Sequence, residues 1–537
     1  MRSKLHARKV AKALGAHDGI IYLPGQWDST YEDSDQGPPF RQRRYFYYLS
    51  GINFPCCSIT YDIEVDKLTL WIPYTPPATI LWFGNTPSPE DCLARSDVHD
   101  VQYTNFLPDY LTSRLSKVKN LYVLRPSQLP KFQEFQSLKP RLHIDTTTLQ
   151  PIMDQARVIK SEYEIAMIRK ANAVSSEAHK HIARSMHRFT NECQIEAAFL
   201  SSCTNQNAHS QAYNIIAGSG TNASTLHYDA NNEPLAGKGL VVLDAGAEWD
   251  CYASDVTRTL PIGPDFSPEA RAIYDLVHQM QDECIQRVRP GVEFRDLQLH
   301  ATLVAVKGLL RLGILHNGTA DEIFKNGTGS AFFPHGLGHH VGLDVHDVLS
   351  KELLRPGADS MWGKRRPIGP SSLIAMIKQA NKPSTPTNTT TTTSTTTTTT
   401  ATTATTTTTS TTPTKTKTTP TKTTTPTKTT TPTKTTTPSP TTTATTTTTE
   451  TNKSFGALQP NMVLTIEPGL YFCRPYIDAY FLRNDQHRKY IDREVLQRYW
   501  NVGGVRVEDC VLVTEEGFEN LTTAPKGEGL LRIVGVA

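Results

Sequence analysis

The hydrophobic and polar positions of roughly the first 150 residues change in short stretches, as in a small mixed domain. Residues 67–74 (KLTLWIPY) alternate in the manner of a strand. Residues 43–51 (RRYFYYLSG) are aromatic and end in a glycine that favours a turn. A break follows near Asp154. We therefore expect an N-terminal domain over residues 1–153.

The pattern then changes to helical blocks followed by strands. Ser161 and Glu164 have the spacing of a capping box and begin a long helical stretch. Residues 239–262 (GLVVLDAGAEWDCYASDVTRTLPI) form two strand-like runs around a short turn. A second helical block begins at Ser267, a cap residue followed by Pro268, and more strand-like segments come after it. The order of helices then strands occurs twice, which predicts an α+β fold with an internal pseudo-duplication.

Between residues 356 and 454 this pattern stops, and most of the segment is threonine with a TPTKTT repeat. Such a composition buries too little apolar surface to offset chain entropy, so we expect a disordered insert. It divides the second domain into residues 154–355 and 455–537. The insert is interpreted mainly as an expansion of a surface loop. An O-glycosylated, mucin-like stalk and an unspliced intron are the alternatives.

Composition excludes several classes of protein. The net charge is +3, and the threonine tract alone holds five lysines, so no basic face for nucleic acid is expected. The first residues lack the apolar region of a secretory signal, and no apolar run is long enough to cross a membrane. The nine cysteines are odd in number and lack CxxC spacing, which favours a reduced protein. We expect a cytoplasmic location.

Two aspartates in residues 239–262 suggest a cation site. If the turn centres on Trp249 and Asp250, Asp244 and Asp255 lie opposite each other on adjacent antiparallel strands. Aspartate is disfavoured in strands, and like charges across a ladder repel, so a cation between them would explain the pair. The alternative is that one aspartate is only a turn residue.

Two glutamates lie in apolar, strand-like segments. Glu467 is in VLTIEPGLY, and Glu508 is in GGVRVEDCVLV with Arg506 two residues before it on the same face. Each glutamate alone is explained as half-exposed or paired with arginine. The coincidence with the two aspartates favours a shared site.

Histidines are concentrated in PHGLGHHVGLDVHD, which holds His335, His339, His340 and His346. One histidine in such a segment is usually structural, but four are hard to explain by packing. His227, in LHYDANNEP, is more often structural when taken alone.

Four carboxylates carry four negative charges, which two divalent cations neutralise. A pair of cations bridged by carboxylates and a hydroxide is a common hydrolytic arrangement. Oxygen-rich ligands favour Mn²⁺ or Mg²⁺ over thiolate-preferring metals, although Zn²⁺ and Co²⁺ also fit.

Over residues 1–355 and 455–537 these motifs resemble the pita-bread metallopeptidases, and within them the proline-specific branch of Xaa-Pro aminopeptidases (aminopeptidase P) and Xaa-Pro dipeptidases (prolidases). The segments that carry the resemblance are LDAGAEWDCYASDVTRT, HGLGHHVGLDVHD, LTIEPGLYF and GGVRVED, together with RRYFYYLSG near the N-terminus. The resemblance implies a creatinase-like N-terminal domain followed by a pita-bread catalytic domain.

The resemblance also implies two divalent metal ions per subunit, with Mn²⁺ preferred. Asp244 and Asp255 would hold one ion, with Asp255 bridging. His339 and Glu467 would hold the other, and Glu508 would bridge the two.

The catalytic residues implied by the resemblance are His227, His335, His346, Glu467 and Arg506. A metal-bridging hydroxide would attack the carbonyl that precedes proline. Glu467 would transfer the proton, while His335 and His346 would steady the tetrahedral intermediate.

The chain departs from the family in its insert, which separates His339 from Glu467 by 128 residues and begins soon after His346. Substrate access is therefore open to change, although no ligand is lost. The expected substrates are peptides with proline at the second position, and a homo-oligomer is expected. The alternatives are a prolidase limited to dipeptides and, more remotely, a non-catalytic binding protein or a metal-free creatinase-type enzyme.

Overall fold

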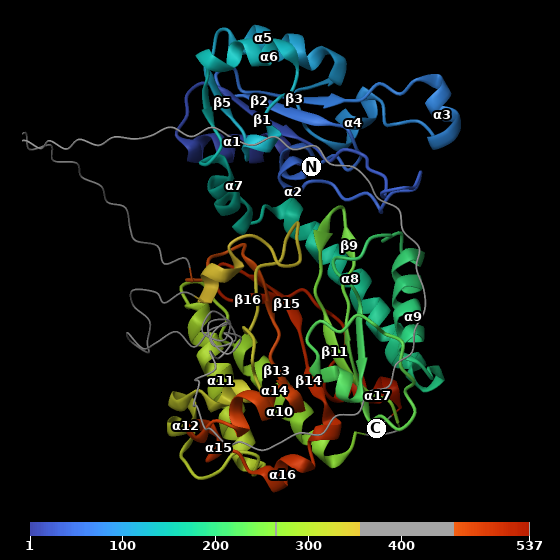
Figure 1. Ribbon diagram of the computed structural model, residues 1–537, viewed down its shortest axis with the longest axis vertical. Coiled ribbons are helices and arrows are strands. Elements are labelled where there is room, and N and C mark those ends of the chain that lie inside the picture. Colours follow the sequence, from blue (N-terminus) through green and yellow to red (C-terminus); the bar gives the residue numbers. More distant parts are fainter. Residues whose placement is uncertain (264–265, 355–455, 536–537) are drawn as a thin grey trace, which may run out of the picture. The chain divides into compact units, whose positions relative to one another are not determined.

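Six strands form the mixed sheet of the N-terminal region: β1 (Ile20–Pro24), β2 (Ser58–Asp62), β3 (Lys67–Ile72), β4 (Asp100–Tyr103), β5 (Asn120–Tyr122) and β6 (His143–Asp145). Their order is β4-β3-β2-β1-β5-β6, with β1, β2 and β3 antiparallel and the outer strands parallel to their neighbours. The computed structural model describes residues 1–263, 266–354 and 456–535 (Figure 1). The threonine-rich insert expected at 356–454 lies outside these residues.

Helices cover both faces of this sheet, because successive apolar side chains of strand β1 point to opposite faces and each face needs cover. Ile20 and Tyr22 pack against one hydrophobic cluster, and Ile21 and Leu23 pack against another. The first cluster includes residues of α5 and α6, and the second includes residues of α1, α2 and α7 (Figure 1). The N-terminal helices are α1 (Ser3–Leu14), α2 (Arg44–Ser50), α3 (Pro77–Phe83), α4 (Pro89–Arg95), α5 (Leu107–Leu115), α6 (Gln133–Leu138) and α7 (Leu149–Val158).

Capping residues stand at the first positions of two helices of the second region, as the sequence predicts. The side chain of Ser161 accepts a hydrogen bond from the amide of Glu164, whose own side chain completes the capping box. Ser267 caps the next block, with Pro268 as its first helical residue. The helices of this part are α8 (Glu162–Ser185), α9 (Glu192–Asn205), α10 (Pro268–Ile285), α11 (Phe294–Arg311) and α12 (Ala320–Asn326).

Each pair of long helices is followed by antiparallel strands. After α8 and α9 come β7 (Ile216–Ser219), β8 (Leu240–Asp244), β9 (Glu248–Trp249), β10 (Tyr252–Ala253) and β11 (Thr257–Pro261). After α10 and α11 come β12 (Val463–Ile466), β13 (Gly469–Tyr471), β14 (Gly504–Arg506), β15 (Asp509–Val513) and β16 (Phe518–Asn520). Short helices α14 (Arg474–Ile477), α15 (Asp485–Arg488) and α16 (Arg493–Gln497) lie between β13 and β14, and α17 (Glu528–Val534) ends the described chain.

The two halves of this region have matching sheets, with strand orders β11-β8-β7 and β12-β15-β16. A bridge between Thr257 and Glu508 joins the first half to the second. Figure 1 shows the helices of both halves outside the central strands. The expected α+β fold with an internal repeat is confirmed.

Among residues 1–263, 266–354 and 456–535, no helix has both the length and the apolar character needed to cross a bilayer. All nine cysteines lie in this part of the chain, and each has a free thiol.

Candidate metal centre

Asp244 and Asp255 lie on one hairpin, but its register differs from the expectation. Asp244 ends β8 and pairs with Thr257, so Asp255 lies two residues before β11 and not opposite Asp244. The turn centres one residue later than predicted, on Asp250 and Cys251, which both have positive φ. A left-handed turn of this kind follows from backbone twist, which the apolar pattern does not encode.

The two glutamates lie at strand ends and not within strands. Glu467 directly follows β12, and Glu508 lies between β14 and β15. His339 lies beside β12, since its backbone carbonyl accepts a hydrogen bond from the amide of Thr465. Strand ends let side chains from several sheets meet at one place, as the resemblance required.

The five expected ligand side chains come together in overlapping groups. Within each of two groups the ligand atoms all lie within 4.8 Å of one another: Asp244, Asp255 and Glu508 in one, and His339, Glu467 and Glu508 in the other. The Nε2 atom of His339 is 3.3 Å from a carboxylate oxygen of Asp255 and 3.3 Å from one of Glu467. Glu508 belongs to both groups, which is the place of a bridging ligand.

The chemistry of these atoms fits divalent cations. One oxygen each of Asp244 and Glu508 is buried and has no hydrogen-bond partner within the described part of the protein. A buried carboxylate oxygen without a partner is costly, so it is a natural place for a cation. The Nδ1 atom of His339 lies 3.1 Å from the carbonyl of His340, which leaves Nε2 as the nitrogen that could bind a cation.

Burial dominates the electrostatics of the site. It raises the pKa of Asp244, and together with the charge of Asp255 it raises the pKa of Glu508 well above its usual range. Burial also raises the pKa of Glu467 to about 7. For His339, burial favours the neutral ring, but the hydrogen bond to Asp255 and the charge of Glu467 outweigh it and raise the pKa to about 9. The negative charge of the buried carboxylates is therefore unfavourable unless a positive charge lies beside them.

His335 and Arg506 are joined through Tyr471. Arg506 donates to the Tyr471 hydroxyl at 2.9 Å, and that hydroxyl is 2.9 Å from Nε2 of His335. Burial, reinforced by the charge of Arg506, lowers the pKa of His335 to about 3. Its Nδ1 is 2.8 Å from the carbonyl of Gly336, so the neutral ring donates there and accepts from Tyr471. Arg506 also pairs with Asp244.

His346 and His227 lie closer to solvent. The ring of His346 is 4.4 Å from that of His339, and one of its nitrogens belongs to a further ligand group with Asp255 and His339. His227 is exposed and acts electrostatically on His335 and His346. The structure therefore brings all nine predicted site residues to one region.

Three site residues were not predicted. Tyr213 places its hydroxyl beside the site, where it accepts a hydrogen bond from the amide of Val256 at 3.4 Å and helps to lower the pKa values of Asp244 and Asp255. Thr257 donates to Glu508 at 2.6 Å, and Tyr471 links the histidine to the arginine. Thr257 and Tyr471 stand inside the quoted motifs, whereas Tyr213 lies in a loop that carries no recognisable signal.

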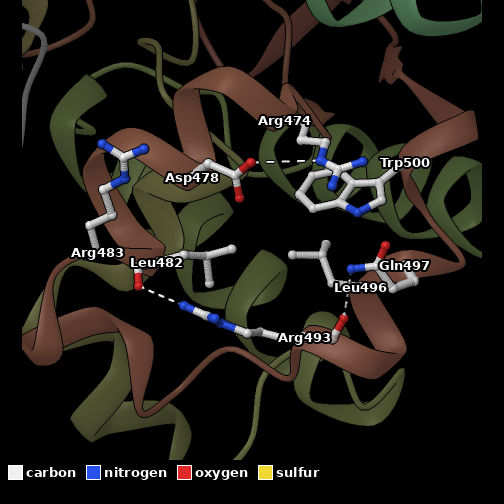
Figure 2. Close-up of a pocket in the computed structure, with 8 residues that line it drawn as sticks. All are labelled: Arg474, Asp478, Leu482, Arg483, Arg493, Leu496, Gln497 and Trp500. Atoms are coloured by element: carbon white, nitrogen blue, oxygen red, sulfur yellow. Dashed lines mark hydrogen bonds and ion pairs between the residues drawn. The ribbon is translucent and has the colours of Figure 1, made fainter.

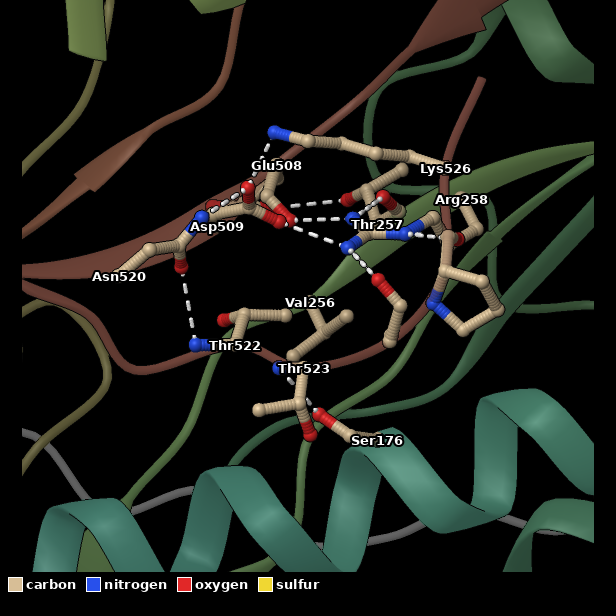
Figure 3. A network of polar contacts seen from close by, with 12 residues as sticks. Ser176, Val256, Thr257, Arg258, Glu508, Asp509, Asn520, Thr522, Thr523 and Lys526 are labelled. Carbon is tan, nitrogen blue, oxygen red and sulfur yellow. Dashed lines mark hydrogen bonds and ion pairs between the residues drawn. The ribbon is translucent and has the colours of Figure 1, made fainter. Parts of the chain in front are cut away.

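Arg258 is a buried arginine that holds together the strands next to Asp255 and Glu508 (Figure 3). Arg258 donates to the main-chain oxygens of Thr257 and Glu508 at 2.8 Å each, and to Asp509 at 2.7 Å. Its remaining donors bind the main chain of residues 524–525. All five guanidinium N–H groups are therefore used, and they tie the strand that follows Asp255 to the strand that follows Glu508.

A cavity of about 290 Å³ lies elsewhere, among α14, the π-helical turn Asp478–Leu482 and α16 (Figure 2). Its lining includes Arg474, Arg493 and Trp500 but none of the predicted site residues. We therefore assign no part of the metal chemistry to this cavity.

Two family descriptions match the sequence. "Metallopeptidase family M24" matches residues 166–375 and 437–515, and "Aminopeptidase P, N-terminal domain" matches residues 3–122. The matched parts correspond to the two regions of the fold.

Curated relatives match along nearly the whole chain. A probable Xaa-Pro aminopeptidase of Colletotrichum graminicola is 48% identical over 539 residues, which cover 99% of this chain and 91% of the relative. One of Metarhizium acridum is 44% identical and covers 99% of this chain and 93% of the relative.

Solved structures share the fold at low identity. Zinc-substituted Escherichia coli aminopeptidase P in complex with product has a TM-score of 0.67 at 20% identity, covering 99% of this chain and 98% of that chain. Pseudomonas aeruginosa aminopeptidase PepP has a TM-score of 0.69 at 23% identity, covering 100% and 98%.

Proposed function

The chain belongs to metallopeptidase family M24, and we propose that it is a metal-dependent Xaa-Pro aminopeptidase, which releases the N-terminal residue from peptides with proline at the second position. The observation that carries the proposal is the convergence of four carboxylates and His339 in overlapping ligand groups. The full-length similarity to curated Xaa-Pro aminopeptidases supports the substrate class.

We propose that the site holds two divalent cations, with Mn²⁺ preferred because oxygen ligands predominate. Asp244 and Asp255 would hold one ion and His339 and Glu467 the other, with Asp255 and Glu508 shared between them. Such cations supply Lewis acidity toward the scissile carbonyl and make water nucleophilic at neutral pH.

The side chains around the ligands would handle the proton and the substrate. Glu467, which lies 3.3 Å from His339 within one of the ligand groups, would take a proton and return it to the leaving proline nitrogen. His346 makes no hydrogen bond within the described residues, so its ring is available to the reacting carbonyl oxygen. We assign His335, held neutral beside Tyr471, and the exposed His227 to the same substrate-facing wall, and Arg506 to the orientation of Asp244.

Product release from Xaa-Pro peptides tests this function. The metal-stripped protein is mixed with a Xaa-Pro dipeptide or a tripeptide with proline second, before and after Mn²⁺ is returned. Cleavage of the tripeptide that needs metal and is lost in His339→Ala and Glu467→Ala supports the aminopeptidase. Cleavage of the dipeptide alone identifies a prolidase, and no cleavage with metal bound contradicts both.

We also propose a homo-oligomer. The short helix α3 has no buried residue, and Trp82 and Phe83 are 78% and 85% exposed. An exposed apolar surface of this kind is typical of an interface. Light scattering after size-exclusion chromatography tests this: Trp82→Glu should reduce the assembled mass, and a monomeric wild type contradicts the proposal.

The domain limits of 1–153, 154–355 and 455–537, with an insert at 356–454, remain our proposal for the organisation of the chain. We likewise propose a cytoplasmic location, which agrees with nine unpaired cysteines. Fractionation of cells that express the tagged protein tests the location.

A further inference from the structure

A buried carboxylate stands next to one of the substrate-facing histidines. Asp347 directly follows His346 and is 4% exposed. One of its oxygens accepts a hydrogen bond from Arg157 at 2.6 Å, and the other accepts one from Lys160 at 3.2 Å. Both cations are themselves 2% exposed. The side chain of Asp347 is therefore held through both of its oxygens.

A second carboxylate of the same loop extends this contact. Asp344 accepts from Arg157 at 3.2 Å and from Arg41 at 3.3 Å, and it lies 3.5 Å from Arg44. Arg41 and Arg44 also bind Glu248, which belongs to strand β9 of the hairpin between Asp244 and Asp255. The cations thus contact two of the chain segments that carry site residues, the hairpin between Asp244 and Asp255 and the loop that follows His339.

The cations come from outside the catalytic sheets. Arg44 begins α2 and Arg41 precedes it, whereas Arg157 lies in α7 and Lys160 lies just before α8. Tyr45 of α2 places its ring 4.9 Å from the guanidinium carbon of Arg157 and donates to Asp154 of α7. The N-terminal region and the connector therefore supply one continuous set of charges.

Stability alone does not account for such a network. Desolvating two charges offsets much of their attraction, and apolar replacements of a buried pair are often as stable. A polar network that satisfies both carboxylates does, however, specify one position for the loop. A displacement of about 1 Å at a reacting group can lower the rate about 100-fold. Fixing the position of His346 therefore gives a functional reason for burying these charges.

We infer that Arg157 and Lys160 are positioning residues, which hold His346 in place through Asp347, and that Arg41 and Arg44 extend this clamp to Asp344. This inference rests on the proposed function. It gives the N-terminal region a part in the reaction, because Arg41 and Arg44 lie at the start of α2 and Arg157 of α7 is stacked on Tyr45 of α2.

The test is the double variant Arg157→Met/Asp347→Asn, which removes one positive and one negative charge and leaves Lys160 an amide oxygen. The matched control is Arg114→Met/Asp62→Asn, the same change in a pair of the N-terminal sheet whose aspartate is 2% exposed. For each protein we would measure kcat and KM on a proline-containing tripeptide, the thermal midpoint, and hydrogen exchange of peptides covering residues 339–348.

The clamp predicts that the first variant loses about 10- to 100-fold in kcat with little change in KM or thermal midpoint. Its residues 339–348 should exchange faster, while the control keeps its kcat. Wild-type kcat in the first variant overturns the inference, whether or not exchange rises. If that variant does not fold, Arg157→Lys carries the same test, because it keeps the charge but loses the terminal guanidinium nitrogen that donates to both aspartates.

The two proposals fail in distinguishable ways. If the wild type cleaves no Xaa-Pro peptide, the proposed function fails, and the exchange measurement still judges the clamp. If the wild type is active and the first variant keeps its kcat, the clamp is overturned and the proposed function stands.

Discussion

Replacing Thr257 by valine removes a single hydroxyl beside Glu508, one of the proposed metal ligands, and keeps the shape of the side chain. The residue is fully buried, and its hydroxyl donates to Glu508 at 2.6 Å and accepts from Arg506 at 3.2 Å. The other oxygen of Glu508 has no partner among the described residues. In Thr257→Val the glutamate therefore loses its side-chain hydrogen bond.

The expected loss of metal affinity follows from the negative charge of Glu508, which accepts this hydrogen bond. A hydrogen bond to a charged group contributes about 1.5–3 kcal/mol, and about 1.4 kcal/mol corresponds to a factor of ten. We expect the apparent affinity for Mn²⁺ to fall about 10- to 100-fold, which is the usual effect of removing a partner of a metal ligand. Because all ligand atoms remain, kcat at saturating Mn²⁺ should change much less.

The assay is tripeptide cleavage as a function of free Mn²⁺ in a metal buffer, with calorimetry of the metal-free protein as a second measurement. Thr257→Ser should restore most of the affinity. The matched control is Thr69→Val in β3, where a buried hydroxyl has no partner in the described chain, so affinity should stay unchanged. If Thr257→Val binds Mn²⁺ as tightly as the wild type, Thr257 does not orient Glu508 and our reasoning is wrong.

Three further changes test other parts of the site. Arg258→Met leaves Asp509 buried with fewer partners and should lower unfolding stability by about 3–5 kcal/mol, seen as a lower urea midpoint; an unchanged midpoint contradicts this account. Tyr471→Phe separates His335 from Arg506 and should lower kcat about tenfold while Mn²⁺ affinity stays constant; an equal loss of affinity would place Tyr471 with the ligands instead. Removal of metal with a chelator leaves the carboxylates uncompensated, so the thermal midpoint should fall and return with Mn²⁺. A cation present at 100 times its dissociation constant contributes about 2.7 kcal/mol, and an unaffected midpoint argues against a metal centre.

The helix starts and the choice of ligand types could be predicted because both depend on neighbouring residues. Ser161 with Glu164, and Ser267 with Pro268, are local capping signals, and the structure places helix starts at both. The family motifs are likewise short continuous segments of sequence, so their ligand residues can be recognised without the fold. The α+β architecture with its repeat followed from the order of such segments.

The hairpin register was not determined by this pattern. Asp244 faces Thr257 because the turn is left-handed at Asp250 and Cys251, and a shift of one residue at the turn changes every partner along the strands. Tyr213 is the other omission, since a loop tyrosine gains its place only when the carboxylates are assembled around it.

By itself, then, the sequence determined which residue types this protein offers to metal and which segments carry them. Only the tertiary structure decided how those residues are held, because the supporting contacts join positions far apart in the chain. Thr257 reaches Glu508 across 251 residues, and Arg157 reaches Asp347 across 190. No local pattern records such partners, since they are selected by the packing of one half of the fold against the other.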